Sequence, residues 1–169
     1  MTEYARFLRL RSSKKILILS ACMLLLSACR PPLADELPRP VGIGRTSGGE
    51  FRFVIPLCEG EAVSAFEIEG HQTGLPVWEV SQPTRTEEQN GEIVLGDARG
   101  FVKQEVPLKR PLPPTVSVSA WLAGDLLVGS GFLLEKVPQS LAGTDRVLKI
   151  GGEILTEEEF RRQVDNDYC

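Results

Sequence analysis

Short stretches in which apolar and polar residues alternate run from residue 51 to the C-terminus, separated by glycine, proline and asparagine. Alternation places successive side chains on opposite faces of an extended chain, which is typical of half-buried β-strands. Turn residues recurring about every ten positions favour short strands in antiparallel sheets. We predict strands at 51–57, 62–69, 75–81, 92–96, 100–106, 115–123 and 126–137, and a small terminal hairpin from 147–150 and 153–155.

The clearest alternation lies at 115–123, TVSVSAWLA. Its apolar positions are predicted to face a core: Val116, Val118, Ala120 and Leu122. Trp121 falls on the opposite face, and an outward tryptophan on a sheet is a common contact for a sugar ring or a protein partner. Trp121 is therefore a candidate ligand-binding residue, unless a helix or loop covers it or a bulge turns it inward. Trp78, flanked by valines, is predicted to be core.

One segment carries a convincing helical signal, at 156–165. Thr156 and Glu159 have the spacing of a capping box, in which each side chain bonds to the backbone N–H of the other residue. Phe160 and Val164 follow on one face, four residues apart. We predict a short C-terminal helix with a small apolar contact.

The number of strands and the proline-rich crossover at 107–114 predict a mainly β domain over 51–169. We expect an antiparallel two-sheet sandwich of immunoglobulin-like or fibronectin-like architecture with a short C-terminal helix. The analogy is architectural, because the Cys…Trp…Cys spacing of true immunoglobulin domains is missing. The alternative is a small β-barrel.

The first 28 residues have the pattern of a signal peptide. Residues 1–15 hold five basic residues and one acidic residue, and the uncharged stretch ILILSACMLLLSA follows at 16–28. Thirteen residues span only about 20 Å as a helix, whereas a bilayer core is about 30 Å thick. A cleaved export signal is therefore favoured over a membrane-spanning anchor.

The end of this segment, Leu26-Ser27-Ala28-Cys29, resembles the lipobox of bacterial prolipoproteins. The resemblance covers residues 1–29 only and implies cleavage before Cys29 and lipidation of its thiol. Leu19-Ser20-Ala21-Cys22 has the same pattern, but the apolar run before it is very short. The implied location is extracytoplasmic, with the membrane as a partner through the lipid at Cys29.

Residues 29–50 follow the lipidation candidate and are rich in proline and glycine, with few bulky apolar residues. Such a composition offers little apolar surface to offset the entropy lost on ordering. We predict a mobile tether here and a folded domain that begins at residue 51.

Cleavage before Cys29 would leave 14 basic and 22 acidic residues, a formal net charge of −8. An acidic domain is a poor nucleic-acid binder, because phosphate backbones require clustered lysine and arginine. Two further cysteines remain, Cys58 and Cys169, in a compartment that permits oxidation. We predict that they form a disulfide; the alternative is two unrelated thiols.

The residues that could support catalysis are few. His71 is the only histidine and falls in the loop GHQTG, where a solvated role is the simplest interpretation. Glu67 and Glu69 project from one strand face about 6–7 Å apart, a separation seen in glycosidase carboxylates and also on ordinary solvated strands. No zinc, calcium or phosphate-loop motif is complete, so we predict no metal and no cofactor.

These observations favour a non-catalytic, lipid-anchored envelope module that binds a protein or glycan partner or supports an assembly. The alternative is an envelope hydrolase that uses paired carboxylates, which would require two acids in a concave pocket. A flat face that carries Trp121 would favour binding.

Overall fold

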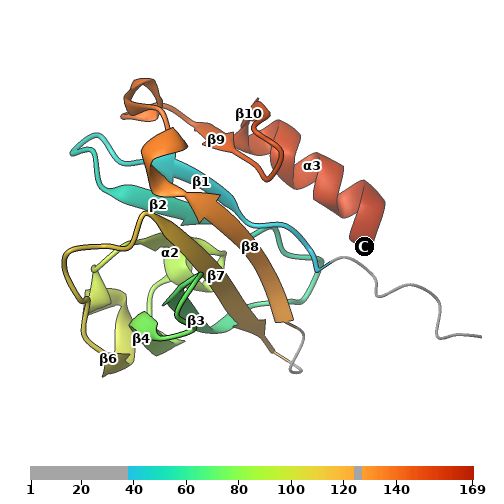
Figure 1. Ribbon diagram of the computed structural model, residues 1–169. Coiled ribbons are helices and arrows are strands. Elements are labelled where there is room, and N and C mark those ends of the chain that lie inside the picture. Colours follow the sequence, from blue (N-terminus) through green and yellow to red (C-terminus); the bar gives the residue numbers. More distant parts are fainter. Residues whose placement is uncertain (1–37, 124–126) are drawn as a thin grey trace, which may run out of the picture. The chain divides into compact units, whose positions relative to one another are not determined.

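A computed structural model describes residues 38–123 and 127–169 of the chain. The predicted signal peptide, the lipidation candidate Cys29 and the first part of the predicted tether lie outside these residues. The described residues form two five-stranded sheets in which paired strands run antiparallel (Figure 1). Sheet A has the strand order β10-β9-β1-β2-β5, and sheet B has the order β6-β4-β3-β7-β8.

The strands of sheet A are β1 (Gly42–Arg45), β2 (Phe51–Val54), β5 (Glu92–Val94), β9 (Arg146–Leu148) and β10 (Ile154–Thr156). Those of sheet B are β3 (Val63–Gly70), β4 (Pro76–Pro83), β6 (Phe101–Val106), β7 (Thr115–Leu122) and β8 (Leu127–Leu133). The helices are α2 (Thr86–Gln89) and α3 (Glu157–Tyr168), with short 3-10 turns at Ala98–Gly100, Leu134–Lys136 and Gln139–Leu141. The predicted two-sheet sandwich is confirmed, and the barrel alternative is wrong because the two sheets do not join into one.

Aromatic side chains fill the space between the two sheets. Phe53 of sheet A lies against Phe66 of sheet B, with ring centroids 5.2 Å apart. Trp78 meets Phe66 edge-on at 5.9 Å and is fully buried, as predicted. The four inward positions predicted for β7 are all buried: Val116, Val118, Ala120 and Leu122. Each large apolar side chain buried in this way contributes about 1.5–3 kcal/mol.

Helix α3 packs on the outer face of sheet A (Figure 1). Its capping box forms as predicted, with both Thr156 and Glu159 bonded to the other residue's backbone. Phe160 and Val164 are buried against Val54 and Val147 in a small cluster separate from the main core. Among the described residues, no helix has the length and apolar character needed to cross a membrane.

The prediction of a mobile tether over 29–50 is wrong for residues 38–50. Strand β1 pairs with β2 over four residues and also with β9, and it occupies the centre of sheet A. Val41 and Ile43 are fully buried. Residues 38–50 therefore belong to the folded domain, ahead of the predicted start at residue 51; residues 29–37 lie outside the described part.

The glycines that made this segment look flexible serve close packing instead. A Cβ atom at Gly42 would lie 2.9 Å from Cε1 of Phe160, and one at Gly44 would lie 2.9 Å from the carbonyl oxygen of Arg146. A glycine inside a strand often marks a place where another group approaches the backbone closely. Here the approaching groups belong to α3 and β9, which are distant in sequence.

Candidate functional site

Trp121 lies on the outer face of sheet B. Its neighbours Ala120 and Leu122 are buried, whereas Trp121 is half-buried, so the alternation that predicted an outward ring holds. Helix α3 covers the other sheet, which removes the alternative that this helix covers Trp121. The tryptophan predicted as a ligand contact therefore stands on a sheet face that α3 leaves open.

Strand register places acidic and hydroxyl side chains beside Trp121. Ala65 of β3 lies opposite Trp121, and Glu67 lies opposite Ser119, the next outward residue of β7. Glu69 lies opposite Ser117, and Glu79 of β4 pairs with Glu67 from the other side. We call this surface the Trp121 face; its residues are Trp121, Ser117, Ser119, Glu67, Glu69 and Glu79.

The carboxylates of the Trp121 face repel one another. Burial, together with the charges of Glu69 and Glu79, raises the pKa of Glu67. Directly opposed side chains on neighbouring strands are only about 4.5–5.5 Å apart at Cβ, so like charges there are unfavourable. A cation bound on this face would relieve the repulsion.

The structure adds a contact that the sequence did not indicate. His71, in the exposed loop between β3 and β4, lies with its Nδ1 2.9 Å from the hydroxyl of Ser117. A serine nucleophile needs a histidine base that a third group orients. Within the described residues no carboxylate hydrogen-bonds to His71, so this pair is an exposed surface contact at the end of the Trp121 face.

A cavity elsewhere on the domain is lined by other acidic residues. That cavity, of about 880 Å³, lies on the sheet A side, between the β1–β2 turn and residues 94–99. Its acids already have local partners: Glu50 binds the hydroxyl of Thr46, and Arg99 hydrogen-bonds to Asp97 and lowers the pKa of Asp97 to about 2. In the described part of the chain, no group of three or more histidine, cysteine or acidic residues could hold a metal ion.

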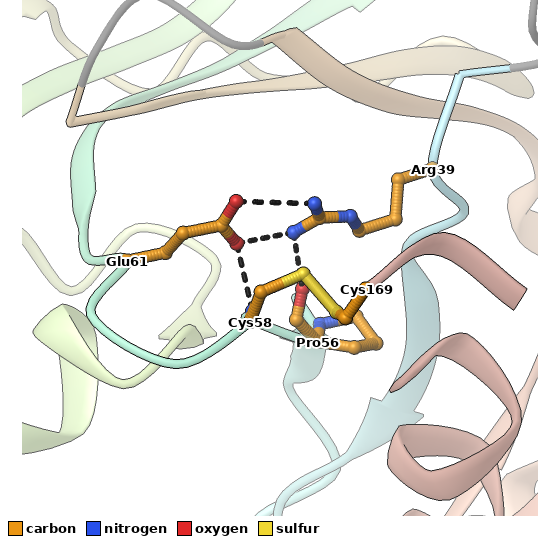
Figure 2. The surroundings of a disulfide bond; sticks show 5 residues. All are labelled: Arg39, Pro56, Cys58, Glu61 and Cys169. Carbon is orange, nitrogen blue, oxygen red and sulfur yellow. Dashed lines mark hydrogen bonds and ion pairs between the residues drawn. A yellow bond between two sulfur atoms is a disulfide. The ribbon is translucent and has the colours of Figure 1, made fainter. Parts of the chain in front are cut away.

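The predicted disulfide between Cys58 and Cys169 is present in the structure (Figure 2). The two Cα atoms are 5.6 Å apart, within the usual range for a disulfide, and the residues are 111 positions apart in the sequence. The bond ties the end of α3 to the loop that follows β2. It is a structural link, because it joins two segments that are far apart in the sequence.

A buried ion pair lies beside this disulfide. Arg39 and Glu61 form two contacts, one of them 3.1 Å from Nη2 to Oε1, and only 6% of the Arg39 side chain is exposed (Figure 2). Arg39 also donates to the carbonyl of Pro56 at 3.4 Å, and the backbone N–H of Cys58 donates to Glu61 at 2.7 Å. The first described residues of the chain are thereby fixed to the loop that bears the disulfide. Sequence reasoning missed this pair because it placed Arg39 in the tether.

We expect Glu61→Gln to lower the free energy of unfolding at pH 7 by about 1–3 kcal/mol, because it leaves the buried Arg39 without a counter-ion. The hydrogen bond from Arg39 lowers the pKa of Glu61 below its ordinary value, while burial opposes this. A carboxylate whose pKa is lowered by folding stabilises the protein above its unfolded pKa of about 4.3, and this contribution disappears as the pH falls through the folded pKa.

The difference between wild type and Glu61→Gln should therefore be full at pH 7 and should shrink below about pH 4. Urea denaturation across this pH range measures it. Glu59→Gln, at an exposed position in the same loop, is the matched control and should change little. A difference that stays constant down to about pH 2, well below the usual carboxylate range, would contradict the role of the Glu61 charge.

Comparison of the chain with protein-family models, with curated proteins and with solved structures gave no match.

Proposed function

We propose that this protein is a lipid-anchored, extracytoplasmic module that catalyses no reaction and binds a basic protein partner through the Trp121 face. The observation that carries the proposal is a sheet face, not covered by α3, on which a half-buried tryptophan stands beside a row of carboxylates. The lipobox resemblance at Leu26-Ser27-Ala28-Cys29 supports the anchor. The Cys58–Cys169 bond supports an oxidising compartment outside the cytoplasm.

The geometry of the Trp121 face suits a lysine or arginine side chain. A cation within about 6 Å of a tryptophan ring is attracted to its face, and the attraction reaches about 2 kcal/mol when water is excluded. Glu67 lies diagonally across the strand pair from Trp121, about 7–8 Å away, within reach of the charged end of the same side chain. Binding would also reduce the repulsion among Glu67, Glu69 and Glu79.

The alternative function is a hydrolase that uses the carboxylates of Glu67 and Glu69. One observation favours it: the pKa of Glu67 is raised by burial and by its acidic neighbours, as in many general acids. However, these groups project from a regular strand, and the 880 Å³ cavity is lined by other residues. A carboxylate mechanism needs both acids on one enclosed substrate, so we favour binding.

The proposed function is tested by one experiment with two arms in intact bacterial cells. In the first arm, metabolic labelling with a clickable fatty acid should mark the wild type and Cys22→Ala, and the mark should disappear in Cys29→Ala. Continued labelling of Cys29→Ala would contradict an anchor at Cys29.

In the second arm, a photo-crosslinking amino acid replaces Ser119, which lies directly opposite Glu67 and two positions from Trp121 on β7. We expect one prominent crosslinked adduct, in which the partner is a protein with a basic surface. Its yield should fall about tenfold or more in Trp121→Ala, as for a central interface residue, and should fall with added salt. The same probe at Ser140, an exposed residue on another part of the surface, is the control.

Each outcome of the second arm decides the proposal. An adduct of equal yield at Ser119 and Ser140, or one that Trp121→Ala leaves unchanged, would rule out the Trp121 face. If the protein binds purified glycan strands and gives no protein adduct at Ser119, the proposed basic protein partner is wrong and the ligand is a sugar.

A further inference from the structure

The described chain begins at the edge of sheet B, beside the Trp121 face. The backbone N–H of Gly129 donates a hydrogen bond of 3.2 Å to the carbonyl oxygen of Arg39, and the backbone N–H of Val41 donates to the hydroxyl of Ser130 at 2.8 Å. Gly129 and Ser130 belong to β8, the end strand of sheet B. Residues 39–41 therefore run along the outer edge of β8 before the chain enters β1 in sheet A (Figure 1).

One row of opposed residues leads from Arg39 into the Trp121 face. Gly129 of β8 lies opposite Ser119 of β7, and Ser119 lies opposite Glu67 of β3. Trp121 is two positions beyond Ser119 on the same side of its strand. Neighbouring strands are about 4.8 Å apart, so the backbone of Arg39 lies about 10 Å from that of Ser119 and about 15 Å from that of Glu67. The chain thus enters the folded domain next to the proposed binding face.

Several contacts fix this entry point. Arg39 forms the buried ion pair with Glu61 and also donates to the carbonyl oxygen of Pro56 (Figure 2). Glu61 in turn accepts a hydrogen bond from the backbone N–H of Cys58, whose disulfide ties the same loop to the end of α3. The chain from Arg39 onward is therefore part of the folded domain. A tether from Cys29 can include only the residues that precede Arg39.

The number of residues between Cys29 and Arg39 limits how far the Trp121 face can lie from an anchor at Cys29. Arg39 is the tenth residue after Cys29, and a fully extended chain spans at most about 3.3–3.6 Å per residue, or about 33–36 Å over this segment. With about 15 Å more along the sheet, the face stays within about 50 Å of the lipidated residue. A tether that continued to residue 50 would have about doubled the length of the segment.

We propose that the partner of the Trp121 face is a protein with a basic surface that is held in the same membrane as this chain's anchor. The inference rests on the proposed function, for the anchor at Cys29 and for the basic partner. A short reach and an entry point beside the face serve a partner that stays near the membrane, whereas a freely diffusing partner would be met equally well at any distance from it. Confinement of both proteins to one membrane also raises their effective concentration. The carboxylates of Glu67, Glu69 and Glu79 disfavour binding of the face to anionic lipid itself.

The test lengthens the reach and leaves the face unchanged. A flexible glycine–serine linker of about 40 residues is inserted after Pro32 in the full chain that carries the photo-crosslinking amino acid at Ser119. The same linker appended after Cys169 is the matched control for added length. Adducts are measured in washed membranes, at the salt concentration that lowers the yield of the uninserted chain to about a tenth, so that the yield is proportional to the effective concentration of the partner. Labelling with a clickable fatty acid must be equal for all three chains.

The inserted linker makes the segment before Arg39 about five times as long. For a partner that diffuses laterally in the same membrane, the space to be searched grows with the root-mean-square length of the segment, so the adduct yield should fall at least about twofold. For a partner held at a fixed neighbouring position the fall should approach about tenfold, because effective concentration decreases as about the −3/2 power of the length. The chain with the appended linker should keep the yield of the uninserted chain.

A yield that the insertion leaves unchanged or raises would overturn the proposal, and so would an adduct that is lost when the membranes are washed, because the partner would then be soluble or held in another layer. If the adduct at Ser119 still depends on Trp121 in that case, the proposed function stands and only the shared membrane is wrong. Absence of any Trp121-dependent adduct from intact cells that carry the uninserted chain would instead refute the proposed function, and this inference with it.

Discussion

Replacing Cys58 and Cys169 together by serine is expected to lower the free energy of unfolding by about 4–5 kcal/mol. The bond closes a loop of 111 residues, and in the chain-entropy model a cross-link of this length removes about that much free energy from the unfolded state. For a domain of this size the melting temperature should fall by roughly 10–20 °C. Calorimetry or thermal denaturation by circular dichroism measures the change.

Reduction provides the control for the serine substitutions. Wild-type protein in excess reductant should melt within a few degrees of the double variant, whereas the double variant should not respond to reductant. Equal melting temperatures for oxidised wild type and the double variant would show that the disulfide contributes no net stability. Two free thiols in freshly isolated protein would show that the bond does not form in the cell.

Phe160→Ala is expected to lower the free energy of unfolding by about 3–5 kcal/mol, as other large-to-small changes at buried aromatic residues do. Phe160 is 1% exposed and belongs to the four-residue cluster that joins α3 to sheet A. Because the cluster is small, few neighbours are available to fill the cavity. Urea denaturation measures the loss, and Tyr168→Ala, at a position on the same helix that is 41% exposed, is the matched control.

The disulfide and Phe160 hold the same helix, so their effects should be coupled. In a double-mutant cycle, the loss caused by Phe160→Ala should differ between the disulfide-bonded protein and the serine variant, because residues that act on one element are not additive. The ion pair of Arg52 with Glu157, 2.6 Å long, is a third attachment of α3. A loss for Phe160→Ala no greater than that for Tyr168→Ala would contradict the role of the cluster.

The strands of sheet B and the C-terminal helix follow from local sequence. Alternation at 115–123 predicted which side chains of β7 are buried, because side chains on a strand alternate between faces wherever one face meets a core. The capping box predicted the start of α3, because its bonds join residues three positions apart. The disulfide was predicted because only two thiols remained outside the implied signal peptide and lipidation site.

Strand β1 could not be recognised from the sequence. Its composition resembles that of a linker, and the reason for its glycines lies in Phe160 and Arg146, which are distant along the chain. The Arg39–Glu61 pair was hidden for the same reason, since the chain on either side of β1 had been assigned to the tether. Composition reports how little apolar surface a segment carries, whereas packing depends on which distant groups approach it.

The Trp121 face shows the same division between local and distant information. The sequence by itself determined that Trp121 projects away from the core and that Glu67 and Glu69 share one face of their strand. Only the tertiary structure brought Glu79 opposite Glu67, placed His71 against Ser117 and set α3 on the other sheet. The physical reason is that periodicity along one strand fixes the direction of its side chains, whereas strand order and register, which decide their neighbours, are set by the pairing of segments far apart in the chain.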